Sequence, residues 1–154
     1  MSIRDSILTI LDAKGVAYRH IVHDVTLTSM ESAAVRGTSM KSGVKSIILR
    51  GKKTGCNYQF NLPSHRKLDM KAVAAIVKEK CDFESEAVIL EKYGLLSGAV
   101  PPFGNLLGIP NYVDEAVLLS DTSAFNCGLR TESLIMDRGD LISMIEAEIS
   151  RFSA

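Results

Sequence analysis

Hydrophobic residues recur at helical spacing in several parts of the chain. Residues 3–11 carry Ile or Leu at every third or fourth position, follow a serine that can cap a helix, and end before Gly15. A capping-box pattern at 28–31 predicts a second helix, which ends at Gly37. Two further helices are predicted after Asp69 and over 84–93. The last predicted helix begins at Asp137 or Asp140 and carries one apolar stripe, formed by Leu141, Ile145, Ile149 and Phe152.

Shorter apolar runs predict strands. They cover 18–23, 44–50, 57–62, 116–119 and 133–136. A polar Gly-Lys-Lys-Thr-Gly turn separates the second run from the third, so these two strands are expected to form a hairpin. The segment 96–110 is rich in Gly and Pro but too apolar for a solvated loop, which indicates a buried or half-buried loop of a kind that often carries function.

The order of these elements indicates one α+β domain over 1–154. The predicted helices have uneven lengths, and at least one pair of strands is a hairpin. The sheet is therefore expected to be mixed or mainly antiparallel, because regular βαβ alternation is missing. No linker, repeat or low-complexity stretch divides the 154 residues.

Charge and cysteine content narrow the possible functions. Lys plus Arg and Asp plus Glu each number 18. This balance argues against a protein that coats nucleic acid extensively, but it permits a local basic patch that contacts a short nucleic-acid end. The odd, widely spaced Cys56, Cys81 and Cys127 form no zinc pattern, so we expect free, reduced thiols in a cytoplasmic protein. No signal-peptide pattern is visible, and no apolar run approaches the ~18 residues of a membrane span.

Two features can carry chemistry. Lys45 lies near the start of an apolar predicted strand, where a lysine either extends to water or pairs with an anion in a cleft. The segment 98–104 reads Gly-Ala-Val-Pro-Pro-Phe-Gly, in which the glycines allow close backbone approach to a ligand and the prolines fix the loop. Its alternative role is a rigid turn that closes a barrel-like sheet. Because proline has no N–H, oxyanion donors would come from residues such as Gly98, Ala99, Phe103 or Gly104.

These features resemble the YbaK and prolyl-tRNA-synthetase-associated editing family. Val-Lys-Ser-Ile-Ile-Leu at 44–49 is similar to the lysine strand of that family, and 98–102 looks like its GxxxP loop. Two weaker similarities support them. The segment 23–33 resembles an early stretch with His, Thr and Glu-Ala, and 125–128 followed by 139–141 resembles the late glycine loop and closing helix. The resemblance covers essentially the whole chain, and the four segments follow one another in the expected order at compatible spacings.

The resemblance implies a mixed, mainly antiparallel, partly barrel-like sheet wrapped by helices, with a pocket between the sheet and the GxxxP loop. It also implies a trans-editing hydrolase that cleaves a wrongly attached amino acid from the terminal ribose of tRNA. The placement of the histidines predicts no metal, and we expect no cofactor. The implied partners are the acceptor end of mischarged tRNA and, as a further candidate, an aminoacyl-tRNA synthetase; the protein is expected to be a monomer.

The resemblance assigns candidate roles to single residues. Lys45 supplies positive charge to the terminal phosphate or to the developing oxyanion, and the amides of the loop at 98–104, hereafter the glycine loop, hold the ester carbonyl. The catalytic candidates are Lys45, Gly98, Phe103 and Gly104. The substrate-binding candidates are Thr28, Pro102, Asn126 and Gly128.

Several polar residues also have purely structural interpretations. Thr28 forms a capping box with Glu31, so a cap is the more common role for it. Cys127 is expected to be a buried, inert thiol, since no neighbouring pattern would activate it. His20 and His23 are expected on opposite faces of a strand, and His65 in a solvated loop whose cations also suit contact with the tRNA backbone.

Two other function classes remain open at this stage. One is a binding module that holds aminoacyl-tRNA or a synthetase without hydrolysis, and the presence of Lys45 argues against it. The other is a hydrolase of small aminoacyl esters, which the zero net charge permits. Which amino acid is removed depends on pocket volume, because one methylene is worth only about 1–3 kcal/mol of discrimination.

Overall fold

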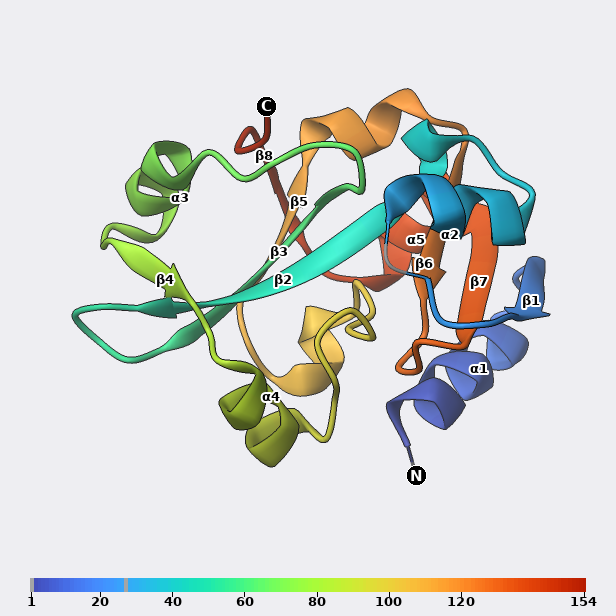
Figure 1. The fold of residues 1–154 in the computed structure, drawn as a ribbon, viewed down its shortest axis with the longest axis horizontal. Helices are drawn as coiled ribbons and strands as arrows, with labels where there is room; N and C mark the ends of the chain where they lie inside the picture. The colour runs from blue at the N-terminus through green and yellow to red at the C-terminus, as the bar shows by residue number, and fades with distance from the viewer. Residues whose placement is uncertain (1, 27) are drawn as a thin grey trace.

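Two β-sheets form the framework of the computed structural model, and helices pack around them (Figure 1). The structure describes residues 2–26 and 28–154. One sheet has the strand order β1-β7-β6, and the other has the order β4-β2-β3-β5-β8. Within the described residues the strands are β1 (Tyr18–Val22), β2 (Val44–Gly51), β3 (Asn57–Pro63), β4 (Cys81–Phe83), β5 (Asn111–Asp114), β6 (Thr122–Asn126), β7 (Glu132–Asp137) and β8 (Glu148–Ser150).

The helices begin where the sequence supplies caps. Their bounds are α1 (Ile3–Ala13), α2 (Ser29–Arg36), α3 (Met70–Val77), α4 (Glu86–Tyr93) and α5 (Arg138–Met144), with short 3-10 turns at Met40–Ser42, Gly104–Leu107 and Glu115–Leu119. The side chains of Ser2, Thr28 and Asp69 each accept a hydrogen bond from a backbone N–H of the first turn, as predicted. Gly37 ends α2 in the left-handed conformation, with φ of 68°.

The larger sheet is mixed. Strands β2 and β3 form the predicted antiparallel hairpin, with Val44 opposite Pro63 and Arg50 opposite Asn57. Strand β5 is parallel to both β3 and β8. The predicted α+β class is therefore confirmed.

The two sheets do not close into a barrel. In the described part of the chain, they meet through an isolated parallel bridge between Gly43 and Ala124. In Figure 1, β2 crosses the molecule from the β6 side to β4. The result is two sheets joined at one corner, with a hydrophobic cluster beside the junction that includes Val44, Phe103 and Phe125.

The predicted strand at 116–119 is wrong. Glu115–Leu119 is a 3-10 helix, because the Asp114 carboxylate accepts a hydrogen bond from the N–H of Ala116 and caps the turn. The apolar residues that suggested a strand are divided between the core and the surface. Val117 is 2% exposed, whereas Leu119 is 84% exposed.

The last predicted helix is too long. Helix α5 begins after its cap Asp137, as expected, but ends at Met144. Asn111 and Asn105 donate to the carbonyls of Ile145 and Met144, and the chain then turns at Glu146, with φ of 48°. Residues 148–150 form β8 beside β5 instead of a further helical turn.

Three short strands are missing from the sequence prediction. They are β4, β5 and β6, with three to five residues each. Such segments are too short to show a period of their own, and β4 and β5 pair with strands that are distant in sequence. Leu27, within the segment 23–33 that resembles the family, lies outside the described residues.

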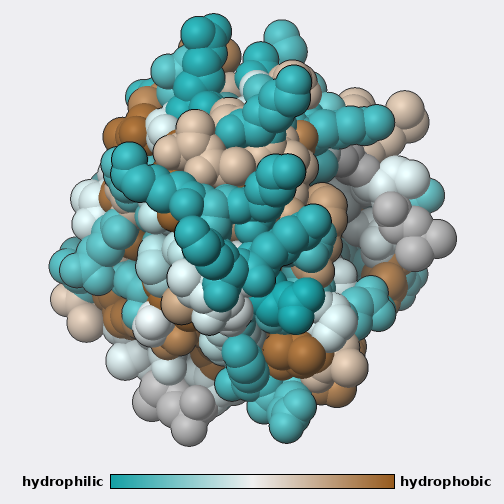
Figure 2. Space-filling view, turned by 90° about the vertical axis from the view of Figure 1, so that its left-hand side faces the viewer, coloured by the Kyte–Doolittle hydropathy of each residue, from teal (hydrophilic) through white to brown (hydrophobic). Residues whose placement is uncertain are grey.

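The face formed by α3, β4 and the β2–β3 turn is covered largely by hydrophilic side chains, with scattered apolar ones (Figure 2). No helix in the described ranges is long and apolar enough to cross a membrane. The apolar side chains of the described residues on this face are scattered and form no broad patch.

The C-terminus is tied to the sheet by one buried carboxylate. Asp114 is 1% exposed, and its Oδ1 accepts from the N–H groups of Phe152 and Ser153 at 2.8 and 3.0 Å. Its Oδ2 accepts from the Ser153 hydroxyl at 2.7 Å. This group therefore holds the last residues beside β5.

We expect Asp114→Ala to lower the free energy of unfolding by about 3 kcal/mol, because it leaves several buried donors without an acceptor. Urea unfolding followed by circular dichroism measures the change. Asp121→Ala, at an exposed position, is the control. Equal midpoints for the two variants would contradict this role of Asp114.

Candidate active site

A cavity of about 520 Å³ lies where the two sheets meet. It is bounded by the segment around the start of α2, the beginning of β2, the loop after α4 and the end of β6. Most of its lining side chains are polar. The lining residues are Val25, Thr26, Thr28, Ser32, Arg36, Val44, Lys45, Ser46, Ser64, Glu86, Ser97, Gly98, Val100, Asn126 and Arg130.

Four of the eight candidate site residues line this cavity. They are Lys45, Gly98, Thr28 and Asn126. Segments far apart in sequence thus converge on one space. The other four, Pro102, Phe103, Gly104 and Gly128, lie outside its lining.

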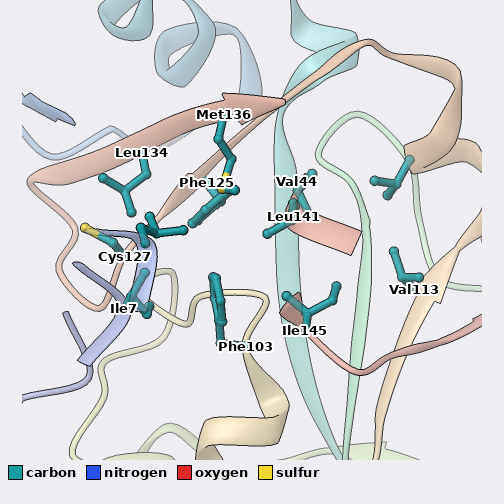
Figure 3. Close-up of a cluster of buried hydrophobic side chains, with 12 residues drawn as sticks. Ile7, Val44, Phe103, Val113, Phe125, Cys127, Leu134, Met136, Leu141 and Ile145 are labelled. Carbon is teal, nitrogen blue, oxygen red and sulfur yellow. The ribbon is translucent and has the colours of Figure 1, made fainter. Parts of the chain in front are cut away.

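Phe103 and Gly104 are packed into the interior. Phe103 is fully buried and points into the cluster that includes Phe125 and Ile145 (Figure 3). A Cβ at Gly104 would lie 2.7 Å from Asn111 Oδ1, so this position admits no side chain without a shift. Both residues therefore support the loop from the side of the core. The catalytic roles predicted for them stay predictions.

Gly128 supports the same loop from the other side. Its N–H donates to the Ala99 carbonyl at 3.0 Å, and its φ of 107° favours glycine. An added Cβ would lie 2.7 Å from the Ile3 side chain. Gly128 thus allows α1 to approach the turn between β6 and β7 closely, while its N–H holds the loop at Ala99.

Buried side-chain amides hold the two prolines of the loop. Gln59 Nε2 donates to the Pro101 carbonyl at 2.7 Å, and Asn111 Nδ2 donates to the Pro102 carbonyl at 3.0 Å. Asn61 links the set by donating to Asn111 Oδ1 at 2.7 Å. These amides on β3 and β5 fix the loop relative to the sheet.

Lys45 is half-buried at the edge of the cavity. Burial lowers the pKa of its ammonium group, and the nearby positive charge of Lys67 lowers it further. Among the described residues, Lys45 has no carboxylate at ion-pair distance. Its charge is therefore available to an anion from outside the protein.

Arg36 is the main feature that the sequence did not reveal. It is 4% exposed and lines the cavity, where burial lowers its pKa to about 10. In the sequence it is only a basic residue at the end of a predicted helix, a place where arginine is common. No local pattern distinguishes it, because its partners come from β6 and β7.

Thr28 and Asn126 are already engaged by the protein. Thr28 Oγ1 accepts from the N–H of Glu31 at 3.1 Å, so the cap interpretation holds even though the residue lines the cavity. Asn126 Oδ1 accepts from Arg36 at 3.0 Å, and its Nδ2 donates to the Leu129 carbonyl at 3.1 Å. The amide of Asn126 is therefore fixed in orientation.

Cys127 has the properties of a structural thiol. It is fully buried among apolar side chains (Figure 3), and burial raises its pKa to about 11. It is absent from the cavity lining.

The histidines have separate partners. His20 Nε2 lies 2.5 Å from Glu132 Oε1, and His23 Nε2 lies 2.8 Å from Ser133 Oγ. His65 is exposed. Over 2–26 and 28–154, no three His, Cys, Asp or Glu side chains form a group suited to a metal ion.

Residues 23–144 match the family described as the aminoacyl-tRNA editing domain, and the chain belongs to this family. The match extends through α2, the lysine strand, the glycine loop and α5. The predicted class, an editing hydrolase that acts on aminoacyl-tRNA, is confirmed at the level of the family.

Individual relatives cover nearly the whole chain. The multifunctional Ser/Thr-tRNA deacylase ProXp-y of Escherichia coli strain K12 is 23% identical over 150 residues, which span 95% of this chain and 90% of the relative. A candidate trans-editing enzyme for prolyl-tRNA synthetase has a similar fold, with a TM-score of 0.85 at 21% identity and coverage of 100% and 98%. The hypothetical protein APE2540 also has a TM-score of 0.85 at 21% identity, with coverage of 96% and 99%.

The burial of the thiols generates a prediction about their reactivity. One thiol per native molecule, that of the exposed Cys56, should react with a thiol reagent at neutral pH, and all three should react after denaturation. Colorimetric titration counts them. Since none of the three cysteines lines the cavity, labelling should leave deacylation unchanged; lost activity would point to a cysteine nucleophile.

Proposed function

We propose that this chain removes serine and threonine from mischarged tRNA by hydrolysing the aminoacyl ester at the terminal ribose. The observation that carries the proposal is the single cavity shared by Lys45 and Gly98, in a chain of the aminoacyl-tRNA editing family. The choice of amino acids is supported by the curated Ser/Thr-tRNA deacylase that is similar over 95% of the chain.

The polarity of the cavity suits a small hydroxylated amino acid. Hydroxyl groups line it on several sides, including those of Thr26 and Ser32, whose oxygens lie 2.6 Å apart. Ser46 is another lining residue, and its buried hydroxyl has no hydrogen-bond partner among the described residues. The hydroxyls of these lining residues are the groups proposed to bond the hydroxyl of serine or threonine, and a site of this kind discriminates against an analogue that lacks it.

Backbone amides of the glycine loop are suited to hold the ester carbonyl. Gly98 and Val100 both line the cavity, and their N–H groups donate to no described residue, whereas that of Ala99 donates to the Leu96 carbonyl at 3.0 Å. We assign the oxyanion donors to Gly98 and Val100. Phe103, Gly104 and the other residues behind the loop act by fixing its shape.

The reaction itself demands little of the side chains. Water adds to the ester carbonyl, the bond from that carbon to the ribose oxygen then breaks, and the ribose oxygen takes a proton. The neighbouring ribose hydroxyl helps to activate the water. Lys45 supplies positive charge to the terminal phosphate or to the developing oxyanion, which is where a preorganised cation has most effect.

The remaining candidates have supporting roles in this proposal. Thr28 and Asn126 border the substrate, Pro102 sets the loop through its carbonyl bond to Asn111, and Gly128 sets it through Ala99. We also propose that the protein is a cytoplasmic monomer with a synthetase partner. These properties fit an enzyme that binds charged tRNA in solution.

We expect Lys45→Ala to lower the deacylation rate by about 10²-fold or more, a typical loss for one preorganised electrostatic group. Release of labelled amino acid from tRNA measures the rate. Lys80→Ala, at an exposed position outside the cavity, is the matched control. Wild-type activity in Lys45→Ala would exclude this role.

Removing the charge of Lys45 should not lower the stability of the protein, although it should lower the deacylation rate. Burial lowers its folded-state pKa, so the penalty for burying the charge is fully present below that pKa and disappears as pH rises through the unfolded-state value. The melting temperature of Lys45→Met at neutral pH should therefore equal or exceed that of wild type, with a smaller difference at alkaline pH. A large loss of stability at neutral pH would indicate a structural lysine.

A panel of mischarged tRNAs tests the substrate. Seryl and threonyl esters should be cleaved at least tenfold faster than valyl esters, because valine has the shape of threonine without its hydroxyl. Cleavage of small seryl esters at the same efficiency would favour a small-ester hydrolase. Equal rates for threonine and valine would reject recognition of the hydroxyl.

A further inference from the structure

Arg36 is a buried cation without an acidic partner in the described part of the chain. Its guanidinium contacts three neutral acceptors. Nε donates to Ser133 Oγ at 2.9 Å, Nη2 to Asn126 Oδ1 at 3.0 Å, and Nη1 to the Ala124 carbonyl at 3.4 Å. Burying a charge with neutral partners alone costs free energy. A purely structural role therefore does not explain why an arginine occupies this position.

The hydrogen-bonding capacity of Arg36 is only partly used. A guanidinium has five N–H groups, and the three bonds above leave one on each terminal nitrogen. A Cβ at Gly43 would lie 3.6 Å from Nη1, so the glycine keeps the space beside that nitrogen open. Two spare donors therefore remain on a residue that lines the cavity.

The charges around the cavity point to an anionic ligand. Arg36, Lys45 and Arg130 are in its lining, against the single carboxylate of Glu86. Arg130 Nε is bonded to the Ser97 carbonyl at 2.7 Å, which ties that cation to the glycine loop. Arg36 is the most deeply buried of the three cations and is held at three points, so its position is fixed before a ligand arrives.

We propose that Arg36 is a second substrate-binding cation, whose spare N–H groups bind an anionic oxygen. In an aminoacyl-tRNA editing site that oxygen belongs either to a phosphate of the acceptor end or to the carboxylate of the amino acid released by hydrolysis. A guanidinium suits both, because its paired donors match two oxygens of either group. The identity of the anion rests on the proposed function, whereas the existence of an anion site does not.

The alternative is that Arg36 only clamps α2 to β6 and β7. A clamp predicts that its removal destabilises the fold and leaves ligand affinity unchanged. A binding cation predicts lost affinity in a protein that stays folded, because a neutral residue avoids the cost of the buried charge.

Calorimetric titration of the free protein distinguishes these roles. Adenosine 5′-monophosphate is compared with adenosine, which lacks the phosphate, and serine is compared with serinamide, which lacks the carboxylate. Arg36→Gln should weaken binding of the nucleotide, of serine, or of both at least tenfold, without affecting adenosine or serinamide. Arg151→Gln is the matched control, since the Arg151 side chain is 84% exposed and lies outside this cavity.

Each outcome decides the proposal. Loss confined to the nucleotide identifies the phosphate as the anion, and loss confined to serine identifies the carboxylate. Unchanged affinity for both, absent binding of both by wild type, or an equal loss for the uncharged ligands would overturn it. Anion binding that depends on Arg36 in a protein without deacylase activity would refute the proposed function and leave this inference standing.

A second measurement covers the case in which Arg36→Gln does not fold. In wild-type protein, the Nε–H resonance of Arg36, assigned through the backbone, should shift on addition of the nucleotide or of serine. Adenosine and serinamide should leave it unchanged. A resonance unmoved by both anions would contradict the proposal.

Discussion

The junction between the two sheets is the constraint on which the site depends. Gly43 bridges to Ala124 of β6, and its carbonyl accepts from the N–H of Ser64 at the end of the β2–β3 hairpin at 2.8 Å. A Cβ at Gly43 would lie 2.8 Å from Ser64 Oγ, so the absence of a side chain at this residue lets it lie close to the end of the hairpin. Lys45 follows two residues later, at the edge of the space that the junction leaves open.

The glycine loop forms one wall of that cavity and is held in place by contacts on its other side. Its prolines provide no N–H, and their carbonyls are held from behind by the amides of Gln59 and Asn111. Phe103 anchors the loop in the hydrophobic core. The N–H groups proposed as oxyanion donors, those of Gly98 and Val100, can therefore be held in place without hydrogen bonds to other protein groups, as an oxyanion site requires.

The predictions from sequence succeeded where the signal is local. The caps at Ser2, Thr28 and Asp69, and the hairpin around 51–55, follow from neighbouring residues and are confirmed. The failures at 116–119 and 145–152 share one cause. In both places buried polar groups, Asp114 in the first and Asn111 in the second, decide the backbone conformation, and hydrophobic periodicity does not register them.

The sequence by itself determined the class of the domain, the lysine strand and the glycine loop, because each depends on residues close together in the chain. Only the tertiary structure decided which of those residues share a cavity. It placed Lys45 and Gly98 in the lining and Phe103 in the core, and it brought Arg36 beside Asn126. Those relations depend on strand pairing between distant segments, and one chain without its relatives carries no local signal of such pairing.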